Sequence, residues 1–322
     1  MRAIRVQTPG GPEVLTVGEL PLRGPAPGEV LVKLDAAGVN FIDIYHRTGL
    51  YPLPLPFTPG LEGAGTVLAV GDAVTSVRVG ERVAWTGVPG AYAEQALLPA
   101  DRLVTLPDGL STRQGAAMML QGLTAHYLAC TTWPLRPDDT CLVHAAAGGV
   151  GLLLCQIAKL RGARVIATVS TEEKAALARG AGADVTILYG HQDFVAETLR
   201  ATDRRGVQVI YDGVGKTTFL RGFDCLAPRG MMVLYGQASG PVEAFDPQLL
   251  AQRGSLFLTR PSLFHYVARR EELVARAGEV SGWILADRLH LRIEREYPLA
   301  EAAAAHRALA GRETTGKVLL IP

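Results

Sequence analysis

The feature that most constrains the fold is an alternation of short apolar runs with helix-length segments that begins near Thr140. Strand candidates lie at 140–144, 164–169, 184–188, 207–212 and 230–235, and the segments between them suit helices, at 150–161, 172–179, 193–202 and 217–226. Strands that are apolar throughout and are joined by helical crossovers predict a parallel sheet covered on both faces. The sequence therefore predicts an α/β fold with a doubly wound central domain.

The two flanking regions have a different pattern. About the first 120 residues combine glycine, proline and β-branched residues in short apolar runs, which predicts many small strands. Beyond residue 261 the chain has helical patterns at 271–284 and 299–309 and then a strand-like run at 318–322. A lone apolar strand needs a sheet to pair with, so we expect it to return to the N-terminal domain. The predicted domains are 1–123 with 262–322, and 124–261.

Charge and cysteine content exclude several classes of protein. The chain has 32 basic and 31 acidic residues and no basic run longer than two, so nucleic-acid binding is not expected. Four cysteines show neither metal-ligand spacing nor disulfide density, and the N-terminus has no apolar secretion segment, which together predict a cytoplasmic protein. Residues 141–158 carry no formal charge, but their small-residue centre favours a turn over a membrane span.

A glycine motif marks the start of the central domain. Ala146-x-Gly148-x-x-Gly151 is the dinucleotide-binding fingerprint with alanine in first place, and it follows an apolar strand and opens an apolar helix. Gly148 allows the backbone to approach a pyrophosphate, Gly151 allows close packing of helix on strand, and the helix N–H groups face the phosphates. The alternative is a glycine-rich turn that only connects two core elements. The five strand candidates of this domain favour cofactor binding.

The end of the second strand bears on the choice of cofactor. An acidic residue there binds the ribose 2′-hydroxyl and repels a 2′-phosphate, but this strand ends at 168–170 without one. Ser170 can donate to a phosphate and Lys174 can supply a charge, which favours NADPH over NADH. Two alternatives stay open: Ser170-x-x-Glu173 is also a helix capping box, and Lys174 is also explained as a solvated surface residue.

Longer motifs resemble a known family. They are Gly10-Gly11-Pro12-Glu13-Val14-Leu15, Gly38-Val39-Asn40-Phe41-Ile42-Asp43, Gly49-Leu50-Tyr51-Pro52, Gly122-Leu123-Thr124, residues 144–151, Tyr211-Asp212-Gly213-Val214-Gly215 and Thr259-Arg260-Pro261-Ser262-Leu263. The sequence resembles the zinc-free, zeta-crystallin-like quinone oxidoreductases of the medium-chain dehydrogenase/reductase superfamily. The resemblance implies a discontinuous, β-rich, GroES-like catalytic domain, a central Rossmann domain and an active site in the cleft between them.

Zinc is not expected. A catalytic zinc needs about three protein ligands. Zinc-dependent relatives carry Cys near the position of Asn40 and Gly-His-Glu where this chain has Gly60-Leu61-Glu62. Glu62 alone is expected to be a structural or polar cleft residue. Without a Lewis acid, an electron-poor quinone suits the site better than a simple alcohol, because positioning of the hydride donor is most of the task.

The resemblance also implies a set of site residues. Asn40 is expected to donate its amide to a carbonyl or to the cofactor ribose, and Tyr45 and Tyr51 to offer aromatic faces and hydroxyls. For each tyrosine the alternative is a half-buried packing residue, and Asp43 is either a cap or part of a polar network. The implied NADPH contacts are Asn40, Thr124, Gly148, Gly149, Val150, Ser170, Lys174, Tyr189, Tyr235, Gly236, Gln237, Arg260 and Arg312. Gly190 and Gln237 depart from the family pattern, and Gly190 weakens the grip on the 2′-phosphate.

These observations predict an NADPH:quinone reductase that transfers a hydride or single electrons. A close alternative is an NADPH-dependent alkenal or enone double-bond reductase, and a remote one is a crystallin-like or RNA-binding role, which rests on analogy alone. The resemblance implies a homodimer joined at Rossmann-domain edge strands, for which 255–258 is the candidate. No membrane partner is expected.

Overall fold

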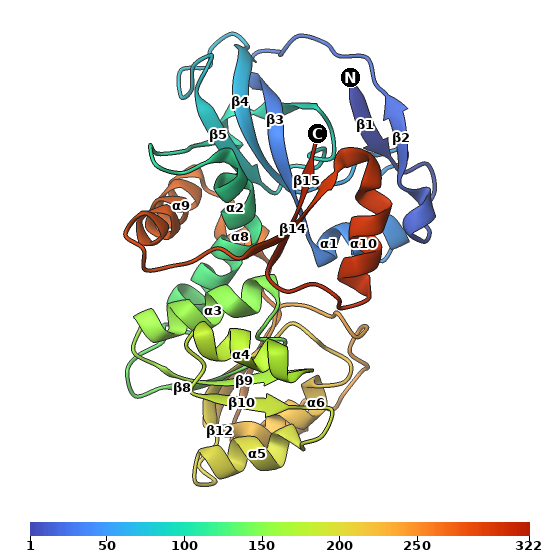
Figure 1. Cartoon of the computed structure of the whole chain (residues 1–322). Coiled ribbons are helices and arrows are strands. Elements are labelled where there is room, and N and C mark those ends of the chain that lie inside the picture. The colour runs from blue at the N-terminus through green and yellow to red at the C-terminus, as the bar shows by residue number, and fades with distance from the viewer. The chain divides into compact units, whose positions relative to one another are not determined.

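The computed structural model describes all 322 residues, and the chain divides into two compact units. Unit 1 comprises Met1–Leu123 and Val267–Pro322, and unit 2 comprises Thr124–Tyr266. Unit 1 is therefore built from two segments of chain, and unit 2 is inserted as a single segment. Figure 1 shows the elements of each unit in chain order.

Unit 2 contains a six-stranded parallel sheet in the order β10-β9-β8-β11-β12-β13. Its strands are β8 (Thr140–Val143), β9 (Arg164–Val169), β10 (Val185–Leu188), β11 (Val207–Asp212), β12 (Leu226–Leu234) and β13 (Phe257–Thr259). Chain order reverses between β8 and β11, which is the arrangement of a doubly wound sheet. The predicted fold class and the five strand candidates are confirmed.

The helices of unit 2 connect these strands. They are α3 (Gly149–Leu160), α4 (Glu172–Gly180), α5 (Phe194–Ala201), α6 (Phe219–Gly222), α7 (Gln248–Gln252) and α8 (Leu263–Tyr266), with a π-helix at Leu128–Thr132 and a 3₁₀ turn at Phe223–Cys225. The helix predicted at 217–226 is shorter than expected. β12 begins at Leu226, four residues before the predicted start, and a 3₁₀ turn occupies the residues directly before it.

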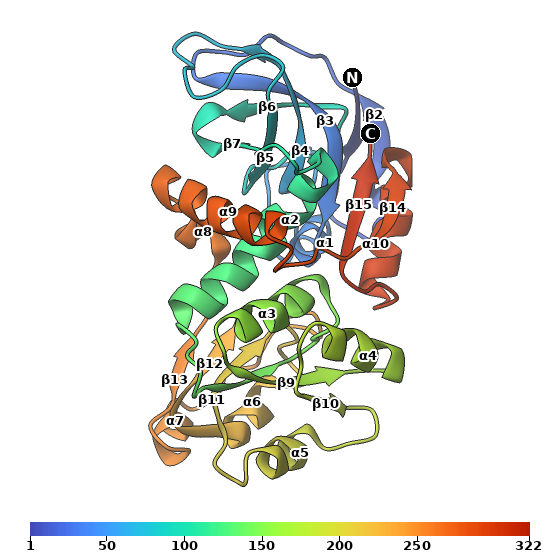
Figure 2. The same ribbon diagram turned by 60° about the vertical axis from the view of Figure 1, so that its left-hand side comes forward.

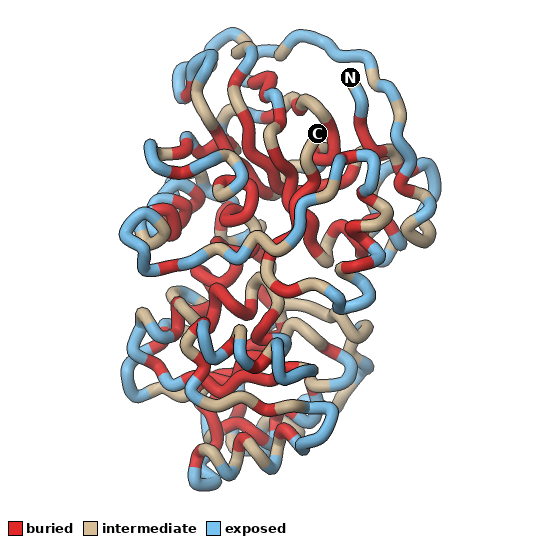
Figure 3. Tube along the Cα trace, viewed as in Figure 1, coloured by how far each residue is buried: buried red, intermediate tan, exposed pale blue.

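The core of unit 2 forms where the sheet meets these helices. Leu142, Ile166, Ile210 and Met232 come from four different strands and are fully buried in one cluster. Burial of each such side chain contributes about 1.5–3 kcal/mol to folding. The trace in Figure 3 shows the central strands of this sheet as largely buried and the loops and outer helix faces as largely exposed.

Unit 1 contains a seven-stranded sheet in the order β14-β15-β3-β4-β5-β7, with β6 also paired to β3, and a separate β1-β2 pair (Figure 2). The strands are β1 (Arg2–Arg5), β2 (Thr16–Glu19), β3 (Glu29–Val39), β4 (Glu62–Val70), β5 (Arg82–Thr86), β6 (Gln95–Pro99), β7 (Val104–Thr105), β14 (Ile293–Pro298) and β15 (Lys317–Ile321). This unit is β-rich, as predicted.

The last strand returns to the N-terminal sheet, as the sequence predicted. β15 pairs antiparallel with β3, with Val318 opposite Val39, and parallel with β14. The helices of this part of the chain are α1 (Phe41–Thr48), α2 (Thr112–Tyr127, which passes into unit 2), α9 (Arg270–Leu285) and α10 (Ala302–Ala310), with 3₁₀ turns at Pro12–Val14, Ala100–Arg102 and Leu299–Glu301. α1 and α2 were not anticipated from the sequence.

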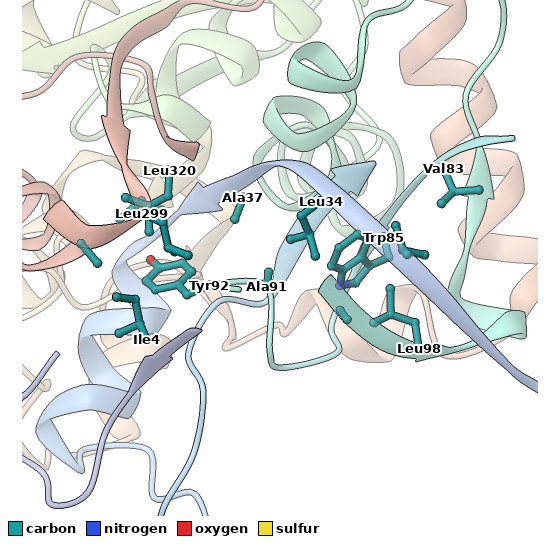
Figure 4. Packing of buried hydrophobic residues seen from close by; sticks show 14 of the residues in the cluster. Ile4, Leu34, Ala37, Val83, Trp85, Ala91, Tyr92, Leu98, Leu299 and Leu320 are labelled. Atoms are coloured by element: carbon teal, nitrogen blue, oxygen red, sulfur yellow. The ribbon is translucent and has the colours of Figure 1, made fainter. Parts of the chain in front are cut away.

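The core of unit 1 is centred on two buried aromatic residues. Figure 4 shows Trp85 packed near Leu34 and Leu98, and Tyr92 packed near Ile4 and Leu320. A Cβ on Gly63 would lie 2.6 Å from the Trp85 ring, so only glycine fits beside this indole. The large Trp85 side chain therefore packs in this sheet only because the neighbouring position, Gly63, has no side chain.

Two aromatic rings hold the ends of unit 2 together. Tyr127 and Tyr266 stack with ring centroids 4.2 Å apart and 12° between planes, and the Thr132 hydroxyl donates to the Tyr266 oxygen at 3.0 Å. The first and last residues of unit 2 are therefore held next to each other within this unit.

Among all the helices of the chain, none combines the length and the apolar character that a bilayer crossing requires.

Candidate active site

The glycine motif forms a tight turn between β8 and α3. Ala145 adopts a left-handed φ of 53°, and the Gly148 N–H donates to the Ala145 carbonyl at 2.9 Å. The Ala146 N–H donates to the Thr168 carbonyl at 3.1 Å, which fixes the turn to the next strand. α3 then begins at Gly149, where the first N–H groups of a helix have no intrahelical partner. This strand–turn–helix context is the one that the sequence predicted.

Gly151 is required by close packing of the helix on the turn. A Cβ at this position would lie 2.5 Å from the Ala145 carbonyl oxygen and 2.7 Å from the Ala146 Cα. Both contacts are with backbone atoms, so a side chain displaces the turn itself. Open N–H groups and the positive end of the helix dipole make this turn suitable for a pyrophosphate.

The other residues predicted for the cofactor follow the carboxyl ends of successive strands. Because all six strands are parallel, these positions share one edge of the sheet. Ser170 follows β9, Tyr189 follows β10, Tyr235 to Gln237 follow β12, and Arg260 follows β13. Tyr189 is exposed, whereas Ser170, Lys174 and the three residues after β12 are half-buried. Thr124 is buried in α2, and Arg312 lies in unit 1, exposed in the turn after α10.

The alternative interpretation of Ser170 as the N-cap of a helix is wrong, because the cap is the next residue, Thr171. α4 begins at Glu172 with Thr171 as its N-cap, and the Thr171 hydroxyl accepts from the Lys174 N–H at 3.3 Å. Glu173 is then the second residue of the helix rather than the third, the place a capping box requires. The Ser170 hydroxyl therefore has no part in the cap.

Asp212 organises the loop after β11. Its carboxylate is buried and accepts from the N–H groups of Val214 and Gly215 at 2.7 and 3.0 Å and from the Thr218 hydroxyl at 2.8 Å. A Cβ on Gly236 would lie 2.6 Å from the Gly213 carbonyl oxygen, so the loops after β11 and β12 touch through backbone atoms. These hydrogen bonds fix the edge that carries Tyr235 and Gly236.

In unit 1, the side chain of Asn40 is surrounded by polar groups. Asn40 is the N-cap of α1, and its backbone N–H donates to Asp43 at 2.8 Å. Its amide nitrogen donates to Glu62 Oε1 at 2.7 Å, and its amide oxygen accepts from Gln121 Nε2 at 3.2 Å and Lys317 Nζ at 3.1 Å. The predicted donation to a substrate thus competes with partners that the protein already supplies.

Lys317 and Glu62 form a buried ion pair beside this amide. Lys317 is 2% exposed and Glu62 is fully buried, and their Nζ and Oε1 atoms are in direct contact. Burial lowers the pKa of Lys317, while the negative charge of Asp43 acts in the opposite direction. The Leu120 N–H donates to Glu62 Oε2 at 2.6 Å, so α2 also contributes. Of the two roles predicted for Glu62, structural residue or polar cleft residue, its burial and its three protein partners support the structural one.

A second buried chain of hydrogen bonds begins at Asp43. The Tyr92 hydroxyl donates to Asp43 Oδ2 at 3.0 Å, so the His306 Nε2–H must donate to Tyr92, also at 3.0 Å. His306 Nδ1 then accepts from Arg47 at 3.4 Å. Burial raises the pKa of Asp43 to about 7 and, with Arg47 adding to it, lowers that of His306 to about 3. Asp43 is thus both cap and network residue.

Tyr45 and Tyr51 lie together at the end of α1. Their ring centroids are 5.2 Å apart in an edge-to-face arrangement, and the Tyr51 N–H donates to the Tyr45 carbonyl at 3.1 Å. Both side chains are half-buried. Sequence reasoning named these two but missed Lys317, Gln121, Tyr92 and His306. The one available signal was a lone lysine directly before an apolar strand.

The residues near Asn40 do not fit a zinc ion. Leu61 stands at the position of a potential histidine ligand and is a buried apolar side chain. Both oxygens of Glu62 and the amide of Asn40 have protein partners, and the ammonium of Lys317 places a positive charge among them. No group of three or more His, Cys, Asp or Glu side chains in the structure is arranged to hold a metal ion.

Comparison with known proteins agrees with this architecture. Residues 26–108 match the family profile described as alcohol dehydrogenase GroES-like domain, and residues 149–274 match that described as zinc-binding dehydrogenase. The chain is 50% identical over 315 residues to a quinone oxidoreductase of Pseudomonas aeruginosa, with 97% of each chain covered. It is 43% identical over 324 residues to a 2-haloacrylate reductase of a Burkholderia species, with 97% of this chain and 96% of that one covered.

A solved structure gives the same result. The quinone oxidoreductase of Escherichia coli complexed with NADPH matches with a TM-score of 0.98 and 43% identity, over 100% of both chains. A parallel sheet with a dinucleotide turn, together with a discontinuous GroES-like unit, defines a medium-chain dehydrogenase/reductase. Within this superfamily, the chain belongs to the quinone oxidoreductase family.

The packing of Gly151 leads to a test of cofactor binding. We expect Gly151→Ala to raise the Kd for NADPH at least about tenfold, because the added methyl group displaces the turn that faces the pyrophosphate. Fluorescence titration measures the Kd. The matched control is Gly180→Ala, since a Cβ there meets nothing within 4 Å. Equal affinity in Gly151→Ala and wild type would contradict this role for the turn.

His306 leads to a prediction on stability. Its folded pKa, about 3, lies below the unfolded value of about 6.5, so the neutral ring stabilises the protein at high pH and this contribution is lost as pH falls from 6.5 towards 3. His306→Gln is expected to cost about 1–3 kcal/mol at pH 8, and progressively less as pH falls below about 6.5.

Urea unfolding at several pH values measures this difference. Asp43 titrates in both proteins with the opposite sign, because its raised pKa stabilises the protein below about pH 4 and that contribution is lost as pH rises through about 7. Its contribution therefore cancels in the comparison. A difference between the two proteins that stays constant from pH 8 to pH 4 would show that His306 does not titrate in this way.

Proposed function

We propose that the protein is an NADPH-dependent, zinc-independent quinone oxidoreductase. Residues 124–261 are assigned to cofactor binding, and residues 1–123 with 262–322 to the substrate. The observation that carries the proposal is the turn at residues 146–151, where backbone packing leaves room only for glycine at Gly151, the third residue of α3, among the open N–H groups at the start of that helix. The relatives named quinone oxidoreductase, one of them complexed with NADPH, support the same assignment.

Unit 2 has the groups needed to hold NADPH. The backbone from Gly148 to Val150 suits the pyrophosphate, Ser170 and Lys174 suit the 2′-phosphate, and Tyr189 suits the adenosine end. The same assignment gives further contacts to Thr124, Tyr235, Gly236, Gln237, Arg260 and, from unit 1, Arg312. When bound, NADPH supplies the hydride.

The contribution of unit 1 is to position the substrate. The paired rings of Tyr45 and Tyr51 present aromatic surface and hydroxyl donors suited to a flat ring with carbonyl oxygens. Asn40 has one amide N–H committed to Glu62, whereas its second contact, to the Gly38 carbonyl at 3.5 Å, is too long to be strong. That second N–H is the one we assign to a substrate carbonyl or to the cofactor ribose.

A quinone matches what these residues can do. Reduction of an alcohol-type carbonyl needs strong stabilisation of the developing alkoxide, which zinc supplies in other enzymes. A quinone becomes aromatic as it is reduced, and weak donors and a proton from water suffice to complete the hydroquinone. Hydrogen-bond donors and aromatic surface are the groups that unit 1 offers.

A second candidate is reduction of an activated carbon–carbon double bond. The specific observation in its favour is the 43% identity to a 2-haloacrylate reductase over nearly the whole chain. Hydride delivery to an enone or acrylate requires the same donor and a similar polar contact to the substrate carbonyl or carboxylate. Neither Asn40 nor the tyrosine pair distinguishes the two acceptors.

A substrate panel separates the two candidates. We expect NADPH oxidation with 1,4-benzoquinone and naphthoquinones at a kcat/KM at least about tenfold above that with enones and 2-chloroacrylate. Loss of absorbance at 340 nm measures each rate, with heat-inactivated protein as the control for direct chemical reduction. Turnover of enones or chloroacrylate alone would replace the quinone assignment with the second candidate.

Substitution of Lys174 tests whether the protein prefers NADPH to NADH. We expect kcat/KM to be higher with NADPH than with NADH, and Lys174→Ala to lower the NADPH value about tenfold while leaving the NADH value unchanged, because only NADPH has a 2′-phosphate. Lys216→Ala is a control, since Lys216 pairs with Glu243. Equal losses with both nucleotides would remove the role given to Lys174.

We further propose a homodimer in the cytoplasm. β13 is an edge strand of the parallel sheet, and its Phe257 and Leu258 side chains are 54% and 36% exposed. An exposed apolar edge of this kind is suited to pairing with a second copy. All four cysteines are free, which suits a reducing compartment.

The exposed edge strand leads to a test of the proposed homodimer. We expect light scattering to give twice the mass of 34.2 kDa, and Phe257→Lys to give a monomer. A monomeric wild type would contradict the proposal.

A further inference from the structure

All four hydrogen-bonding positions of the Asn40 side chain face groups of the protein, three of them at 3.2 Å or less and one N–H only at 3.5 Å. The amide has two N–H donors, which face Glu62 and the Gly38 carbonyl, and two acceptor positions, which face Gln121 and Lys317. The residue is only 4% exposed. A single orientation of the amide satisfies all four contacts.

The charges of Lys317 and Glu62 determine the orientation of the Asn40 amide. An ammonium group has only donors, so the atom of Asn40 that faces Lys317 must be the oxygen. A carboxylate has only acceptors, so the atom that faces Glu62 must be the nitrogen. Rotation of the amide by 180° would place N–H groups against the ammonium and an oxygen against the carboxylate. The ion pair therefore excludes the second orientation, which neutral partners would allow.

The residue types at positions 317 and 38 indicate that the ion pair does more than fill space. The chain has 27 arginines and only five lysines, yet a lysine occupies this buried position. A Cβ on Gly38 would lie 2.1 Å from Glu62 Oε1 and 2.5 Å from Lys317 Nζ, so the space is filled by the pair itself. A compact ammonium fits there, whereas the larger planar guanidinium of arginine needs more room.

We propose that Lys317 and Glu62 are positioning residues that hold the Asn40 amide in one orientation, with its N–H that faces Gly38 available to the reacting partner. Contact of the Lys317 charge with the Asn40 oxygen also polarises the amide, which makes its N–H groups stronger donors. The catalytic part of this inference rests on the proposed function, and the orientation of the amide does not.

The first experiment measures kcat/KM with NADPH and 1,4-benzoquinone. Lys317→Met alone leaves Glu62 buried without a counter-charge, which destabilises the fold, so Lys317→Met is combined with Glu62→Gln. We expect this double variant and Asn40→Ala each to lose at least about tenfold in kcat/KM. Lys33→Met is the matched control, because Lys33 is an exposed lysine on β3 of the same sheet, and it should retain wild-type activity.

Combining the substitutions distinguishes positioning from a general structural effect. If Lys317 and Glu62 act through Asn40, the triple variant loses no more than about twofold beyond Asn40→Ala. Losses that multiply in the triple variant, or a double variant within twofold of wild type, would overturn the inference. Thermal midpoints and far-ultraviolet circular dichroism spectra, measured on the same proteins, show that each variant is folded.

A second experiment does not depend on turnover. Asn40 is the only asparagine in the chain, so labelling with ¹⁵N-asparagine gives a single side-chain amide in a ¹H–¹⁵N spectrum. We expect two well-separated, slowly exchanging proton signals in wild type and in Lys33→Met, because one proton faces a carboxylate and the other does not. In the double variant the signals should approach each other and exchange faster.

The spectrum and the assay together separate two kinds of failure. An unchanged amide spectrum in the double variant would show that the ion pair does not hold Asn40, whatever the activity. A wild type that oxidises no NADPH with quinones would refute the proposed function, while the spectrum would still decide whether Lys317 and Glu62 fix the amide.

Discussion

The buried ion pair between Lys317 and Glu62 is the constraint on which the interior of unit 1 depends. Moving each charge out of water costs several kcal/mol, and the mutual attraction offsets this only if the remaining polar atoms also find partners. Here Glu62 receives further hydrogen bonds from Asn40 and the Leu120 N–H, and Lys317 also donates to Asn40. Strands β4 and β15, helix α2 and the start of α1 are thereby tied to one point.

The two buried networks of unit 1 meet at the first turn of α1. Asn40 belongs to the ion-pair network through its side chain, and its backbone N–H joins it to Asp43 and the Tyr92–His306–Arg47 chain. Helix α1 is held from both sides, which gives Asn40, Tyr45 and Tyr51 a rigid support.

Sequence reasoning succeeded where local pattern decides the structure. The parallel strands of unit 2 are largely apolar, and the glycine motif has a defined place between strand and helix, so both were predictable from the sequence pattern. The return of the last strand followed from the need to pair an apolar edge. By contrast, α1 and α2 carry buried polar residues such as Asp43 and Gln121, which interrupt the apolar period that identifies a helix.

The polar site residues that sequence reasoning missed share one property. Lys317 contacts Glu62 across 255 positions of sequence, and His306 contacts Tyr92 across 214. No local pattern contains such pairs, and a single sequence does not reveal which side chains the fold brings together. The N-cap at Thr171 instead of Ser170 was missed for a smaller reason, because both residues are good caps and the boundary shifts by one position.

The two-segment construction of unit 1 also sets an order of events during synthesis. β3 and β4 leave the ribosome early, but β15 follows only after the whole of unit 2 has been made. Until then Glu62 has no counter-charge and is more stable in water than in a closed sheet. Unit 2 is a continuous segment with its own core, so its folding does not require β15, whereas unit 1 is complete only when β15 pairs with β3.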